Sequence, residues 1–209
     1  MAPKVSEAHT KQRREQIIMA AMQCFATNGF HKTTMQDICK KSDLSPGAVY
    51  SYFASKDEII QALCQMGDQM NNQLFEFSHQ HEFASPQAAL AHSIGLFISQ
   101  YKHPMMQLGA RMDAMFLAEA LTDETLASMG NESYTKLMNQ IIALMENSQR
   151  ENEIDPTINT RALSQVLFSL VQGLAAQLLM SGDEEIDVDA YQEAVTKLVT
   201  QDIFVTPKK

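Results

Sequence analysis

The sequence of 209 residues has no tryptophan, and aromatic residues make up only 7% of it although 45% of its residues are hydrophobic. It has only eight glycines, and it shows neither the alternating apolar pattern of β-strands nor a hairpin turn. A run of about 18 uncharged apolar residues, which a membrane-spanning helix would need, is also missing, and the first residues lack the apolar core of a signal peptide. These absences predict an all-α protein located in the cytoplasm.

The residue patterns that catalysis or metal binding would need are also missing. We find no glycine-rich nucleotide loop and no nucleophile elbow. His79 and His81 lie two residues apart, so they would not share a helix face and do not predict a metal site. The three cysteines, Cys24, Cys39 and Cys64, lie on apolar helix faces, which favours buried reduced thiols over a redox sensor. We therefore predict no catalytic residue, no metal and no cofactor.

Positive charge is scarce outside the first part of the chain. Residues 1–60 carry eight Lys and Arg against six Asp and Glu, a net charge of +2, and residues 61–209 carry eight against nineteen, a net charge of −11; together they give the total of −9. A protein that bound nucleic acid by charge alone would not have this balance. Any contact with nucleic acid is therefore expected near the amino terminus.

What the sequence does have is a pair of short helix signatures between residues 33 and 58. Thr33 is predicted to cap the first helix, with Gln36 at the third helical position reaching back to it. This helix should end near Lys41 and Ser42, and Asp43 should take a left-handed backbone conformation in the turn. The pattern predicts one short helix followed by a tight turn.

The second helix of the pair follows at once. Ser45 is predicted to cap it, with Pro46 at its first position, where the missing N–H group is not needed. Val49 and Phe53 lie four residues apart and should face inward, which leaves most of the other side chains available to a partner. Ser55 and Glu58 should start a further helix at Lys56. Two short helices joined by a tight turn form the helix-turn-helix layout that places its second helix in the major groove of DNA.

These residues resemble the TetR family of bacterial transcriptional regulators over roughly residues 10–65. The segments that carry the resemblance are Cys24–Phe30, Thr33–Met35, Asp37–Cys39, Leu44–Tyr50, Tyr52–Phe53 and Ser55–Asp57. One departure is Ser42-Asp43, where family members commonly have Ala-Gly, and it predicts a slightly strained turn. The resemblance implies a sequence-specific DNA-binding regulator, by default a repressor, that is an all-α homodimer on a palindromic operator.

The domain organisation follows from the same resemblance and from helical periodicity. We expect about nine helices: a flexible basic arm over residues 1–9, a three-helix helix-turn-helix DNA-binding domain over 10–55, and a helical effector-binding and dimerisation domain over 56–205. Thr122 is predicted to cap the seventh helix. The last two helices are expected over about 160–181 and 187–203.

The resemblance also implies which residues contact DNA. The second helix of the pair would enter the major groove and read thymine methyl groups and DNA shape through its small leading residues, while tyrosine hydroxyls, Lys56 and the start of the preceding helix hold phosphates. Met35 fits the groove and the core equally well. The candidate DNA contacts are Thr34, Met35, Ser45, Pro46, Gly47, Ala48, Tyr50, Ser51, Tyr52 and Lys56.

Residues 160–181 are apolar on two sides, so this helix should bury two sides. Together with the last helix it would form an intermolecular four-helix bundle, as in the family; the alternative is a central helix buried in a monomer. The candidate dimer residues are Leu163, Leu167, Leu170, Leu174, Leu178, Tyr191, Val195 and Leu198.

Fourteen methionines, many of them in the middle helices, suggest an adaptable apolar site for a small lipophilic effector, although a methionine stripe is more often core. The candidate pocket residues are Met66, Met70, Met105, Met112, Met115, Phe116, Met138 and Gln172. Two alternatives remain: a TetR-like regulator controlled by a protein partner with no small-molecule site, and, more remotely, an enzyme.

Overall fold

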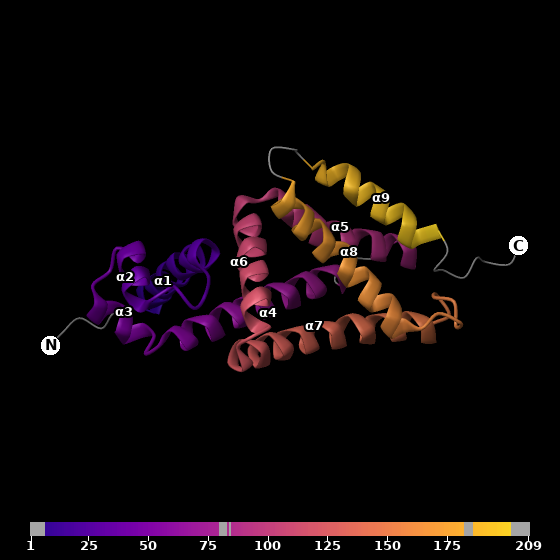
Figure 1. The fold of residues 1–209 in the computed structure, drawn as a ribbon. Coiled ribbons are helices and arrows are strands. Elements are labelled where there is room, and N and C mark those ends of the chain that lie inside the picture. The colour runs from indigo at the N-terminus through magenta and orange to yellow at the C-terminus, as the bar shows by residue number, and fades with distance from the viewer. Residues whose placement is uncertain (1–6, 80–82, 84, 182–185, 202–209) are drawn as a thin grey trace, which may run out of the picture. The chain divides into compact units, whose positions relative to one another are not determined.

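A computed structural model describes residues 7–79, 83, 85–181 and 186–201, and these residues form nine α-helices and one short 3-10 helix, η1 (Figure 1). The all-α prediction is confirmed. The elements are α1 Glu7–Asn28, α2 Met35–Ser42, α3 Pro46–Tyr52, α4 Lys56–His79, α5 Pro86–Ser99, η1 Gln100–Lys102, α6 Pro104–Ala120, α7 Glu124–Arg150, α8 Thr160–Met180 and α9 Val188–Gln201.

The chain divides into two compact units. The first unit contains residues up to Gly67 together with Arg111–Asn131, and the second unit contains Asp68–Ala110 and the residues from Glu132 onward. The helices α4, α6 and α7 each contribute residues to both units. Of the expected basic arm, residues 1–6 lie outside the described residues, and residues 7–9 are already helical. The first unit is thus larger than the expected domain over residues 10–55.

The inward faces of α1, α2 and α3 contribute to the core of the first unit. Ile17 and Phe25 of α1, Ile38 of α2 and Val49 of α3 are fully buried. The ring of Phe30 stacks on Phe25 with centroids 4.4 Å apart. Burying a side chain of this size stabilises a fold by roughly 1.5–3 kcal/mol. This core holds α2 and α3 against α1.

The second unit has its own hydrophobic core around α5, α8 and α9. Ile98 and Leu174 are fully buried in it. Gly95 lets α9 pack closely on α5, since a Cβ atom at this position would lie 2.7 Å from Nε2 of Gln192. The hydroxyl of Tyr191 donates to the carbonyl oxygen of Leu170 at 2.7 Å, which joins α9 to α8.

Local capping sets where several helices begin, as at α5, where the Ser85 hydroxyl accepts from the N–H of Ala88 at 3.2 Å. The predicted cap of α7, Thr122, was wrong: Asp123 accepts from the N–H groups of Thr125 and Leu126 at 2.9 and 3.0 Å. A carboxylate is favoured there because helix starts attract negative charge. The bonds from Leu126 and Thr125 hold the pKa of Asp123 below its usual range, and nearby His31 lowers it further.

The helix α8 is, within the described residues, the one that is long and apolar enough to cross a membrane by length and composition. Only 28% of its apolar window is buried within the chain. The length and composition of a single helix are weak evidence for a membrane span, because a helix that packs on a second subunit has the same composition.

Candidate nucleic-acid interface

The start of α2 is fixed by a capping box one residue later than predicted. The cap is Thr34, whose hydroxyl oxygen accepts from the N–H of Asp37 at 3.2 Å, and the Asp37 carboxylate accepts from the N–H of Thr34 at 2.9 Å. The prediction of Thr33 with Gln36 was wrong, since the buried hydroxyl of Thr33 donates to the carbonyl of Gly29. A carboxylate at the third position binds the N–H more strongly than an amide does.

The turn between α2 and α3 has the predicted geometry. Asp43 has φ 56° and ψ 39°, the left-handed conformation, and its N–H group bonds back to α2. Nε2 of Gln16 donates to the carbonyl of Ser42 at 2.6 Å, which ties the turn to α1. An aspartate in this conformation is strained relative to glycine, so the turn is held by its surroundings.

The start of α3 is also as predicted. Ser45 caps the helix by accepting from the N–H of Ala48 at 3.2 Å, and Pro46 occupies its first turn. Val49 and Phe53 are buried, with exposed fractions of 0% and 1%. Because these two side chains anchor one face, the opposite face of α3 is left for a partner.

The outward face of α3 carries small side chains and one exposed tyrosine. Gly47 has open space around it, because an added Cβ atom would meet nothing within 4 Å. Tyr50 is 52% exposed. The Ser51 hydroxyl donates to the carbonyl of Ala48 at 2.6 Å, which leaves its oxygen as an acceptor. Of the other predicted contacts, Ser45 and Pro46 are exposed, Ala48 and Tyr52 of α3 are half-buried, and so is Met35 at the start of α2.

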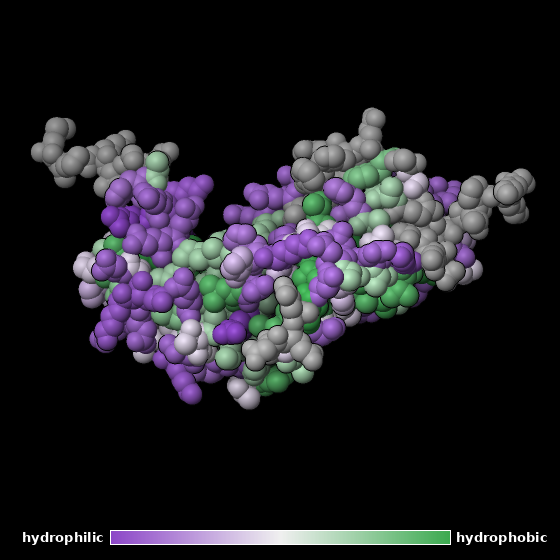
Figure 2. Space-filling model, turned by 90° about the horizontal axis from the view of Figure 1, so that it is seen from above, coloured by the Kyte–Doolittle hydropathy of each residue, from purple (hydrophilic) through white to green (hydrophobic). Residues whose placement is uncertain are grey.

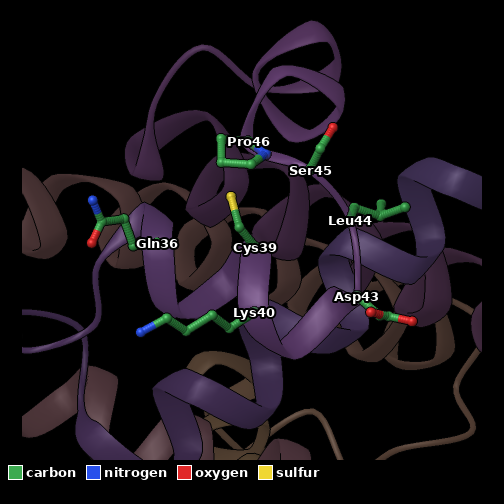
Figure 3. A pocket seen from close by; sticks show the side chains of 7 residues that line it. All are labelled: Gln36, Cys39, Lys40, Asp43, Leu44, Ser45 and Pro46. Carbon is green, nitrogen blue, oxygen red and sulfur yellow. The ribbon is translucent and has the colours of Figure 1, made fainter.

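A shallow hollow of about 430 Å³ lies between α2 and the start of α3, and Figure 3 shows the side chains around it. It is lined by Gln36, Cys39, Lys40, Asp43, Leu44, Ser45 and Pro46. None of the residues predicted to bind an effector lines it. The hollow brings the exposed cation of Lys40 beside two predicted DNA contacts, Ser45 and Pro46.

Two cations near the pair of helices have protein partners. Nζ of Lys56 donates to the carbonyls of Phe30 at 2.6 Å and Thr33 at 3.2 Å, so this half-buried ammonium holds the loop before α2. Arg14 lies over the ring of Phe53 at 4.2 Å and donates to the carbonyl of Tyr52. The sequence gives no signal for these long-range contacts, because the partners are backbone or aromatic groups more than 20 residues away.

The predicted pocket residues are divided between the two units. Met66, Met112, Met115 and Phe116 belong to the first unit, and Met70, Met105, Met138 and Gln172 to the second. The Phe116 ring packs edge-on against Phe30 with centroids 5.3 Å apart. Met138 is buried, whereas Met66, Met105 and Met115 are about 40% exposed. The predicted set therefore contains both buried and exposed side chains and does not belong to one unit.

Within the second unit, several predicted dimer residues face the unit's own core. Leu167, Leu174 and Val195 are buried there, and Leu163, Leu170, Leu178 and Tyr191 pack against them. Leu198 is 69% exposed in the single chain, so its place at an interface stays a prediction. Two further apolar side chains of α8, Val166 and Met180, are also exposed and are not among the predicted dimer residues. Figure 2 shows apolar side chains reaching the surface as green areas between polar ones.

Comparison with known families gives two matches along this chain. Residues 17–63 match the bacterial regulatory proteins of the tetR family. Residues 109–202 match the C-terminal domain of BetI-type transcriptional repressors. The first match covers the helix-turn-helix and the start of α4, and the second covers much of α6 to α9.

Individual relatives agree with these matches over most of the chain. The HTH-type transcriptional regulator UidR of Escherichia coli K12 is 29% identical over 82% of this chain and 84% of its own length. Among solved structures, FadR of Bacillus subtilis in complex with stearoyl-CoA is 23% identical, with a TM-score of 0.69 over 90% of this chain and 98% of its own. A transcriptional regulator from Saccharomonospora viridis in complex with choline is 17% identical, with a TM-score of 0.70 over 94% and 100%. The two structures share the fold of this chain.

Proposed function

Because this chain belongs to the TetR family and is a DNA-binding transcriptional regulator, we propose that it is a cytoplasmic repressor whose affinity for a palindromic operator is changed by a small lipophilic effector. The observation that carries this proposal is α3, which is capped by Ser45, anchored by Val49 and Phe53, and open on its other face. The chain is not an enzyme, and its curated relatives are named as regulators.

Base readout would use the small side chains at the start of α3. Pro46, Gly47 and Ala48 offer no long hydrogen-bonding group, so they would read thymine methyl groups and DNA shape. Tyr50 and Tyr52 would hold phosphates through their hydroxyls, and so would the N–H groups at the start of α2 beside Thr34 and Met35. These phosphate contacts set the register of α3 on the duplex.

Lys56 has a narrower role than a free phosphate-binding cation. Two of its three donors already serve the carbonyls of Phe30 and Thr33. The exposed Lys40 and Lys41, at the end of α2, and the exposed Lys32, in the loop before it, are therefore better placed than Lys56 to approach a phosphate. We propose that Lys56 contributes through its remaining donor and through the position that it gives to the loop.

A second copy of the chain would pack on the exposed apolar face of α8 and α9. Val166, Met180 and Leu198 are exposed apolar side chains of these helices that would contact the second copy, while the other predicted residues lie in or against the unit's own core. Gly173 and the exposed Ala176 would allow close approach of a helix. A dimer suits a palindromic operator, because two recognition helices about 34–36 Å apart read half-sites one turn apart.

The effector would act by shifting a population between DNA-binding and non-binding states. One solved neighbour was obtained with stearoyl-CoA, whose acyl chain is long and apolar, and this supports a lipophilic effector; the other was obtained with choline, a small cation. We propose that the methionines of the second unit, Met70, Met105 and Met138, contact such a ligand together with Gln172. A hundredfold loss of operator affinity needs a coupling free energy of about 2.7 kcal/mol, within the usual range for allostery.

The test is a selection of bound DNA from a randomised duplex pool, with the wild-type chain and with Ala48→Asp. We expect the wild type to enrich a palindromic site and the variant, whose carboxylate would face the groove, to enrich none. Failure of the wild type to enrich any sequence contradicts the proposal.

Stearoyl-CoA and choline are then added to the wild-type complex with the selected DNA. Release or tightening by either compound supports an effector of that class. If neither changes operator affinity, the alternative of a regulator controlled by a protein partner gains support.

A further inference from the structure

The loop between α1 and α2, residues 29–33, holds a carboxylate from a distant helix. The adjacent N–H groups of Phe30 and His31 both donate to Glu119, at 2.9 Å to Oε1 and 2.7 Å to Oε2. Glu119 lies near the end of α6 and belongs to the same unit. Successive N–H groups in such a turn form a concave site for an anion, and here the anion is a side chain of the protein. Bonds of this kind are roughly twice as strong as neutral ones.

Gly29 makes room for this carboxylate. Its φ of 80° lies in the left-handed region, which ends α1 and turns the next two N–H groups toward α6. A Cβ atom at this position would lie 2.2 Å from Oε1 of Glu119. Glycine is therefore required twice, by its backbone conformation and by the approach of the carboxylate.

The carbonyl groups of the same loop are held from another helix. Lys56, the first residue of α4, donates to the carbonyls of Phe30 and Thr33. Glu119 is 21% exposed, and its Oε2 lies 3.7 Å from Nε2 of His31. The loop that leads into α2 is thus fixed by an anion from α6 on its N–H groups and by a cation from α4 on its carbonyls.

We infer that Glu119 is a positioning residue for DNA binding: its carboxylate at the end of α6 fixes the loop at residues 29–33 and thereby the orientation of α2 and α3, without contacting DNA. The inference rests on the proposed function. The contact of Glu119 also joins α6 to the loop before the helix-turn-helix, and residues 104–110 of the same helix belong to the second unit.

The experiment uses the full-length chain with Glu119→Gln and, as a matched control, Glu124→Gln, an exposed carboxylate in the first turn of α7. The glutamine keeps the shape of the side chain, but it has one acceptor oxygen for two N–H groups and no charge. Affinity is measured for the operator selected by the wild type and for an unrelated duplex. Hydrogen exchange of the Phe30 and His31 amides and thermal unfolding are followed in parallel.

We expect E119Q to weaken operator binding by roughly 5- to 150-fold, the usual range for coupling between separate sites. Binding to the unrelated duplex should change much less, the two loop amides should exchange faster, and E124Q should behave like the wild type. Operator affinity of E119Q within about twofold of the wild type overturns the inference while the proposed function stands. A wild-type chain that selects no DNA overturns both.

A second pair of variants distinguishes the proposed role of Glu119 from a general loss of stability in E119Q. Gly29→Ala should displace the carboxylate from the loop side, so the double variant G29A/E119Q should bind the operator no more weakly than G29A alone. Additive losses in operator affinity would show that the two residues act independently and would overturn the inference.

Discussion

The helix-turn-helix and the α8–α9 pair differ in the range of the contacts that shape them. In α2 and α3, caps and turn are made by residues within five positions of each other, as between Ser45 and Ala48 or Thr34 and Asp37. In the second pair, contacts join residues far apart in sequence, as between Tyr191 and Leu170. Local chemistry thus sets where α2 and α3 begin and end, long-range contacts such as those of Gln16, Lys56 and Glu119 hold them in place, and tertiary packing decides which face of α8 stays free.

The largest effect is expected from Phe53→Ala, which removes the buried anchor of α3. Truncating a buried phenylalanine costs about 3–5 kcal/mol of unfolding free energy. Chemical denaturation measures this loss, and Tyr50→Ala on the exposed face of α3 is the control. A loss below about 1 kcal/mol would contradict the anchoring role of Phe53.

A slightly smaller effect is expected from Val166→Glu and Leu198→Glu, which place a charge on the exposed face of α8 or α9. Each variant should keep the helical content of the wild type but sediment as a monomer, and it should lose operator affinity by about a hundredfold, or 2.7 kcal/mol. Asn139→Glu, at an exposed position of α7, is the control. A variant that remains a stable dimer would exclude this face as the interface.

A moderate effect is expected from Tyr50→Phe. Losing one hydroxyl that holds a phosphate should cost about 0.5–1.5 kcal/mol of DNA-binding free energy, equally for operator and unrelated DNA. A base-specific change in Tyr50→Phe would argue against a phosphate role.

Lys56→Ala is expected to act differently, because Lys56 also holds the loop before α2. It should lower the unfolding free energy, since the loop carbonyls lose their donor. It should also reduce the salt slope of DNA binding, but by less than the one unit expected for a full phosphate contact.

A smaller effect of opposite sign is expected from Asp43→Gly. Glycine takes the left-handed conformation without strain, so the unfolding free energy should rise by up to about 1 kcal/mol. Thermal unfolding measures it. A decrease in the unfolding free energy would mean that the Asp43 side chain makes a stabilising interaction that outweighs the backbone strain.

The smallest effect is expected at low pH from Asp37. The bonds from the hydroxyl and the N–H of Thr34 hold the pKa of Asp37 below its usual value. A lowered folded-state pKa gives stability that is present above the unfolded-state pKa of about 3.9 and is lost as the pH falls through the folded-state value. Asp37→Asn should therefore lose less stability than the wild type on acidification below about pH 4. Parallel acid profiles would contradict the capping box.

The sequence predicts well where one local interaction decides the outcome. The left-handed Asp43, the Ser45 cap with Pro46 and the inward Val49 and Phe53 follow from backbone and side-chain chemistry within a few residues. The cap of α2 was predicted one residue too early, because two threonines are adjacent in the sequence. Only the folded structure, in which Thr33 is buried and bonded to Gly29, distinguishes them. The carboxylate of Asp37, three residues after Thr34, was a signal that could have resolved this.

Long-range contacts escaped prediction for a different reason. The bonds of Glu119 and Lys56 to the loop at residues 29–33 use backbone groups, which every sequence has, so no residue pattern marks them. Likewise α8 is apolar on two sides, and periodicity cannot tell which side its own core takes. Leu167 and Leu174 proved to face inward, whereas Val166 stayed exposed.

The most direct test of α3 as the DNA-reading helix of a dimer is a repeated DNA selection with Gly47→Arg. An arginine fits here because Gly47 has open space around it, and arginine pairs with guanine in the major groove. The account predicts a new preference for guanine at one symmetric pair of positions, with the rest of the palindrome unchanged. A selected site identical to that of the wild type, or a change at only one unsymmetric position, would contradict it.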